Sequence, residues 1–177
     1  FSNRIRGVFP REHRIVVVNL GGGTSELRAK SADNPVSLLG EAPKVRATDP
    51  GAYALFLQAR EVSRQYNAAA FERAIALYRQ ALQIDPMYAP AWNGLAFVYF
   101  GQIDLDVLTA EQGLMLGRDA VNKALERNPS LAPAYGNLAL FEGFIERDLQ
   151  AAARHIEQGL ALDPTNLEVI GVACGVA

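Results

Sequence analysis

A glycine-rich turn near the amino end contains the residue types best suited to chemistry. Residues 15–30 read IVVVNLGGGTSELRAK, in which a β-branched run leads into three glycines and a threonine. Glycines admit a left-handed backbone and let N–H groups approach an anion closely, so a turn of this kind after a strand can cradle phosphate groups. If the turn binds a nucleotide, its contacts are Gly21, Gly22, Gly23 and Thr24.

The same stretch resembles the phosphate loop of the actin-like ATPase superfamily, where an acidic residue precedes a Gly-Gly-Gly-Thr turn. This sequence departs from that pattern at Asn19, which stands at the acidic position. The resemblance would also imply two large α/β lobes and a second phosphate loop, whereas only residues 1–49 lie outside the helical repeats described below. No lysine of the Gly-x4-Gly-Lys type follows the turn. We therefore favour a β-hairpin with a strand at residues 13–20 over a nucleotide site.

No other group of side chains has the spacing of a catalytic or metal centre. With one cysteine, Cys174, and no His-x3-His spacing, a zinc site is not expected. Asp104, Asp106 and Glu111 lack the glycine and the twelfth-position glutamate of a calcium loop. His155 lies in an expected helix, where it should face a neighbouring surface or solvent. We predict that the chain is not an enzyme and needs no cofactor or metal.

Composition and charge disfavour nucleic acid and membrane as partners. Half of the 177 residues are hydrophobic and the net charge is −2. Residues 1–50 carry eight Lys or Arg against five Asp or Glu, and residues 51–177 carry nine against fourteen. The basic residues include a cluster at Arg4, Arg6, Arg11 and Arg14, but four arginines alone are a weak signal, so a disordered or docking leader is favoured over a nucleic-acid arm. No apolar run reaches the roughly 18–20 residues that cross a bilayer.

The two ends of the sequence suggest a piece of a longer protein. It begins with Phe1 and closes within the apolar run VIGVACGVA. A cytoplasmic location is favoured, and a periplasmic one would follow if a membrane anchor precedes the fragment.

One pattern recurs three times in residues 50–177. Pro86, Pro129 and Pro164 each follow Asp or Asn. Twelve, eight and five residues before each proline stand a small, a large and a small residue: Ala74, Tyr78 and Ala81; Gly117, Val121 and Ala124; Ala152, Ile156 and Gly159. Spacings of three, four and seven mark one face of a helix, and the small residues let two helices approach closely.

Residues typical of helix starts accompany this pattern. Asp49-Pro50 predicts the start of the first helix. Two further pairs predict capping boxes, Thr109 with Gln112 and Thr165 with Glu168.

These residues resemble the tetratricopeptide repeat (TPR) family. Its W-x2-L-G-x2-Y half is matched by Trp92, Leu95, Ala96 and Tyr99, and its A-x3-F-x2-A-x4-P half by Ala74, Tyr78, Ala81 and Pro86. The resemblance implies a mainly α fold, a helix-turn-helix solenoid over residues 50–177 with about three hairpins and a terminal single helix. Residues 1–49 would form a small β-containing N-terminal segment and a linker. Extra residues within 63–71 and 100–116 would make either longer helices or loops.

The resemblance also implies a ligand groove along the first helix of each unit. Its candidate residues are Gln58, Asn93, Phe97, Phe100, Asn137, Leu140 and Phe144. Asparagines can bond the backbone of an extended peptide, and the apolar residues can take its side chains. None of the seven is Lys or Arg, so the basic clamp with which some TPR domains grip acidic chaperone tails is not expected. The three phenylalanines could instead pack against neighbouring helices, or the N-terminal segment could fill the groove.

Two functional readings follow. The first is a non-catalytic scaffold that binds a peptide or partner protein, with homo-oligomers forming through the uncapped terminal helix at Ile170. The second rests on a narrower resemblance of residues 47–96 to TPR tails of bacterial signalling proteins. Those tails follow an adenylate or guanylate cyclase domain or a winged-helix transcriptional activator, often after a TolB-like segment, and the activity would then lie outside this chain.

Overall fold

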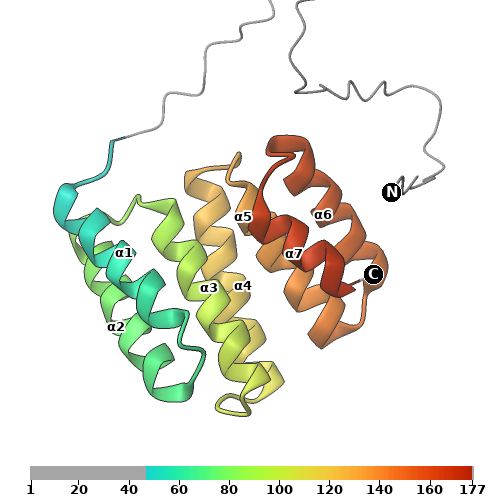
Figure 1. The fold of residues 1–177 in the computed structure, drawn as a ribbon, viewed down its shortest axis with the longest axis horizontal. Coiled ribbons are helices and arrows are strands. Elements are labelled where there is room, and N and C mark those ends of the chain that lie inside the picture. The colour runs from blue at the N-terminus through green and yellow to red at the C-terminus, as the bar shows by residue number, and fades with distance from the viewer. Residues whose placement is uncertain (1–46, 177) are drawn as a thin grey trace, which may run out of the picture. The chain divides into compact units, whose positions relative to one another are not determined.

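The computed structural model describes residues 47–176, and all regular structure in that range is helical (Figure 1). The predicted mainly α fold is therefore confirmed. The expected β-hairpin, its glycine turn at Gly21–Gly23 and the arginine cluster lie outside the described residues. The helices are α1 Pro50–Ser63, α2 Ala68–Ile84, α3 Ala89–Asp104, α4 Ala110–Arg127, α5 Ala132–Leu140, the π-helix η1 Phe141–Glu146, α6 Leu149–Leu162 and α7 Leu167–Val176.

The helices pair as successive antiparallel hairpins. α1 packs on α2, α3 on α4, and α5 with η1 on α6, while α7 packs on α5 and α6. Helices α1, α3, α5 and α7 also contact one another in that order, so they form one layer of the stack (Figure 1). Each hairpin thus buries its apolar face against the next.

The recurring Asp-Pro or Asn-Pro pair ends the second helix of each hairpin. Proline disfavours helical backbone at the residue before it, so the helix stops there. The side chain of that preceding residue then accepts a hydrogen bond from the backbone N–H two residues on. This turn occurs in all three units, as Asp85 to Met87, Asn128 to Ser130 and Asp163 to Thr165, each at 3.1 Å.

Helix starts agree with the predicted caps in two cases and differ in one. Asp49 accepts hydrogen bonds from the first turn of α1, and Thr109 with Gln112 forms the predicted capping box of α4. The capping box predicted at Thr165 is wrong. Its hydroxyl donates to Asp163 at 2.9 Å within the turn, and α7 is capped one residue later, where Asn166 accepts from the Val169 N–H at 3.2 Å.

The extra residues of the first two units make both longer helices and loops. α2 has 17 residues and α4 has 18, against 14 in α6. The connections within the three hairpins each place one residue other than glycine at positive φ, namely Tyr66, Asp106 and Arg147.

Small residues bring the two layers into close contact, as predicted. Tyr78 and Phe141 are fully buried, and each fills the space opposite a glycine. A Cβ at Gly94 would lie 2.3 Å from Tyr78 Cζ, and one at Gly117 would lie 2.1 Å from Phe141 Cζ. Any larger residue at these glycines would therefore displace a core aromatic ring.

Candidate functional site

A cavity of about 810 Å³ opens between helices α1, α3, α5 and α7. Its volume lies within the range of roughly 300–1,000 Å³ that is usual for ligand sites. Six of the seven residues predicted to line a groove do line it: Asn93, Phe97, Phe100, Asn137, Leu140 and Phe144. We call this space the groove cavity.

Gln58 is exposed and lies outside the lining of the groove cavity. α1 contributes Phe56, Arg60, Ser63 and Arg64 instead. These residues recur at intervals of three and four and so share one helix face, whereas Gln58 is two residues from both Phe56 and Arg60 and falls on another.

An asparagine pair joins α3 to α5 at the base of the cavity. Asn137 Nδ2 donates to Asn93 Oδ1 at 2.8 Å and to the Asn93 backbone carbonyl at 3.0 Å. Both side chains are nearly buried. The pair uses the amino group of Asn137 and the carbonyl of Asn93, so the Asn93 amino group and the Asn137 carbonyl remain for a ligand.

The cavity phenylalanines pack against one another and also face the open space. The ring of Phe100 makes edge contacts with Phe141 and Phe144, at centroid distances of 5.9 and 6.0 Å. Phe97 lies 6.5 Å from Tyr66, which belongs to the α1–α2 turn. Phe144 is 38% exposed, so an apolar ligand group could cover it.

Arg60 and Arg64 give the groove cavity basic residues that sequence reasoning missed. They lie near Ser63 and Tyr78, which also line it. Burial raises the pKa of the Tyr78 hydroxyl to about 12; a hydrogen bond with Ser63 and the charge of Arg60 act in the opposite direction. The expectation of a groove without arginine therefore holds for the seven predicted positions but not for the cavity.

Helix α7 forms the last wall of the cavity, and the sequence did not predict this wall. Its contributions are Leu167, Glu168, Gly171, Val172 and Gly175. The spacing of these residues shows that they share one helix face. Apart from Glu168, the residues of α7 are apolar or small on every face, so the sequence did not indicate which face lines a cavity.

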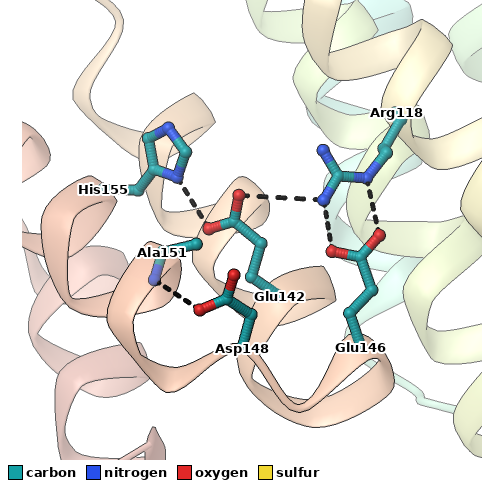
Figure 2. A network of polar contacts seen from close by, with 6 residues as sticks. All are labelled: Arg118, Glu142, Glu146, Asp148, Ala151 and His155. Atoms are coloured by element: carbon teal, nitrogen blue, oxygen red, sulfur yellow. Dashed lines mark hydrogen bonds and ion pairs between the residues drawn. The ribbon is translucent and has the colours of Figure 1, made fainter.

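A polar network lies under η1, at the end of the third hairpin (Figure 2). Glu142 is 5% exposed, and its Oε2 lies 2.7 Å from Nδ1 of His155 on α6. Arg118 on α4 approaches Glu142 at 3.7 Å and also pairs with Glu146. His155 thus faces a neighbouring helix, one of the two surroundings expected for it, and holds a buried carboxylate there.

Residues 47–176 contain neither a cluster of metal ligands nor a helix that could span a membrane. No group of three or more His, Cys, Asp or Glu side chains in residues 47–176 is placed to hold a metal ion. Within the same residues, no helix combines the length and apolar character needed to cross a membrane.

Comparison with known proteins shows the same repeat and fold. A family model for the TPR repeat matches residues 70–102. The structure is similar to the first TPR domain of the human RPAP3 protein, with 21% identity, a TM-score of 0.56, and 71% of this chain and 89% of that chain covered. It is also similar to the first TPR of Spaghetti (RPAP3) bound to the HSP90 peptide SRMEEVD, with 21% identity, a TM-score of 0.54, and coverage of 73% and 93%. No curated protein matches the chain. Residues 70–102 therefore contain a TPR repeat, and the described helices have the TPR fold.

Proposed function

We propose that this chain is a non-catalytic interaction module that binds a peptide, or an extended segment of a partner protein, in the groove cavity. One observation carries the proposal. The cavity places the Asn93–Asn137 pair beside the exposed ring of Phe144 and the arginines of α1.

These groups suit an extended peptide. An amide side chain can both donate to and accept from a peptide backbone, and the Asn93–Asn137 pair holds its two amides in fixed positions. Apolar residues around them, Phe97 and Leu140 among them, can take side chains from one edge of the peptide.

The similar Spaghetti domain was solved with the acidic peptide SRMEEVD. The seven predicted groove positions lack basic residues, which disfavours such a tail, but Arg60 and Arg64 add positive charge to the cavity wall. SRMEEVD is therefore a useful first probe, although the proposal does not depend on it.

A variant that fills the cavity provides the test. A Cβ at Gly171 would meet no atom within 4 Å, so Gly171→Leu can place its side chain in the cavity without displacing the fold. Leucine also favours helix over glycine by about 1 kcal/mol, so the variant should stay folded. Ala153→Leu, on an exposed position of α6 outside the cavity, is the matched control.

The wild-type chain should enrich peptides from a displayed random dodecapeptide library, and Gly171→Leu should lose them while Ala153→Leu keeps them. Fluorescence anisotropy gives the dissociation constant of each enriched peptide for the three chains, and the ratio to wild type gives the loss of affinity. A library that yields no peptide, or peptides that bind Gly171→Leu equally well, would refute the groove as the binding site.

The signalling context remains a second prediction. Sequencing the complete reading frame would decide it, since a cyclase or winged-helix domain must precede residue 1 if that reading is right.

A further inference from the structure

The charges of the groove cavity lie on opposite walls. Arg60 and Arg64 come from α1, whereas Glu168 comes from α7. Helices α3 and α5 lie between α1 and α7 in the stack (Figure 1), and their lining residues form the floor of the cavity. We infer that the occupant is a charge-asymmetric peptide: a side-chain carboxylate lies at α1, a large apolar side chain lies on the floor, and a neutral or basic residue lies at α7. This inference rests on the proposed function and adds the chemistry of the ligand.

Arg60 is the strongest sign of an anionic group at α1. Its side chain is exposed, and its guanidinium carbon lies 5.8 Å from the centroid of the Phe56 ring. It makes no ion pair with any residue that the structure describes. Stacking on Phe56 limits the positions that the guanidinium can take, so less side-chain freedom is lost when it meets a carboxylate.

Arg64 lies one turn further along the same face. Its ion pair with Glu61 is 3.7 Å long, and both side chains are about three-quarters exposed. Such surface pairs contribute little, so Arg64 can turn to a ligand at small cost. Two guanidinium groups on one wall favour a carboxylate over a neutral amide, because charge-assisted hydrogen bonds are the stronger kind.

The floor of the cavity favours a ligand with a large apolar side chain. Phe97 and Leu140 are half-buried in the free chain, and Phe144 is 38% exposed. Covering these groups removes apolar surface from water, which favours a bulky side chain at this point of the ligand.

The wall at α7 differs in both shape and charge. Gly171 leaves its helix backbone open to close approach, and Glu168 stands at the start of the helix. A second acidic residue of the ligand would be repelled here. Arg60 lowers and Glu168 raises the pKa of the buried Tyr78 hydroxyl, so charges from both walls act on the same part of the cavity.

The test uses peptides enriched on the full chain, resynthesised with both ends blocked so that side chains carry the only charges. Replacing the acidic residue by its amide should weaken binding about five- to tenfold. Arg60→Gln should weaken the acidic peptide by a similar factor, and the two changes together should cost no more than either alone. Glu168→Gln should weaken peptides with a basic residue at the other end. Arg154→Gln, on an exposed position of α6 outside the cavity, should change no dissociation constant.

Three results would overturn the inference about the ligand's charges and still leave the groove cavity as the binding site. Enriched peptides that Gly171→Leu rejects but that lack acidic residues would remove the carboxylate from the ligand. If the loss caused by replacing the acidic residue adds fully to the loss caused by Arg60→Gln, the acidic residue does not contact Arg60. Binding that requires a free carboxyl terminus would assign the charge to the chain end and not to a side chain. A complete failure to enrich peptides would refute the proposed function itself.

Discussion

Asn137 Nδ2 donates to Asn93 Oδ1 at 2.8 Å, across the interface between the second and third hairpins. The same nitrogen also donates to the Asn93 backbone carbonyl. The two asparagines that were expected to bind a ligand therefore also hold α3 against α5. This link joins the two helices that form the cavity floor, where the proposed peptide would lie.

Asn137→Ala should lower the free energy of unfolding by about 1–3 kcal/mol, because it leaves the nearly buried side-chain carbonyl of Asn93 without its donor. Denaturant titration followed by circular dichroism measures the loss. Asn122→Ala, on an exposed position of α4, is the control and should stay within about 0.5 kcal/mol of wild type. If Asn93→Ala and Asn137→Ala are strictly additive in the double variant, the bond does not couple the hairpins.

Glu142→Gln should destabilise the third hairpin by about 1–3 kcal/mol. The change removes the nearly buried carboxylate that both His155 and Arg118 contact. Glu146→Gln tests the same arginine at a carboxylate that is 33% exposed, and should cost less than about 1 kcal/mol. Denaturant titrations of the two variants compare them directly. Equal losses would show that burial of Glu142 has no energetic consequence.

The parts of this structure that could be predicted are those that repeat. The Asp-Pro and Asn-Pro turns and the small residues follow from one helical period counted from a fixed proline. The six groove residues follow from the positions of the repeat counted from Trp92 and Tyr135. Periodicity sets which residues share a face, and stacking decides that the face is buried.

The features that the sequence did not predict lie where the helical period changes or has no reference residue. η1 is a π-helix with hydrogen bonds from residue i to i+5, so the α-helical period does not predict which of its side chains are buried. Glu142, a charged residue, is 5% exposed there. Gln58 lies outside the groove cavity. α1 has no tryptophan at the position of Trp92, so the sequence offered no reference residue for the register of the first unit. Arg60 and Arg64 were missed for the same reason.

Two helical glycines should respond to alanine with opposite signs. Gly117→Ala should lower the free energy of unfolding by about 1–3 kcal/mol, since the new Cβ would lie 2.1 Å from Phe141 Cζ. Gly171→Ala should raise it by up to about 1 kcal/mol, because alanine favours the helix and its Cβ meets nothing within 4 Å. Thermal and denaturant unfolding of the two variants measure both effects. A stabilised Gly117→Ala would mean that Phe141 has room to move.

Stability should fall on the alkaline side as buried tyrosines ionise. The pKa of Tyr78 is raised to about 12 by burial, against an ordinary value of 10.0, and those of Tyr66 and Tyr88 are raised to about 12 mainly by burial as well. The folded chain therefore holds these phenolic protons more tightly than the unfolded chain does. The stability they contribute is present in full below pH 10 and is lost as the pH rises through 12. For Tyr78, which is 2% exposed, two pKa units correspond to about 3 kcal/mol.

Tyr78→Phe isolates this contribution, because phenylalanine keeps the ring against Gly94 and removes the ionisable group. Unfolding free energies measured between pH 8 and pH 12 should fall less steeply in this variant than in wild type, and absorbance of the tyrosinate ion should follow the same transition. Ala153→Leu is the control, since it changes an exposed position of α6 and no ionisable group, and its profile should run parallel to that of wild type. If the Tyr78→Phe profile is also parallel to wild type, the Tyr78 hydroxyl ionises no later in the folded chain than in the unfolded one, and its burial does not stabilise the neutral form.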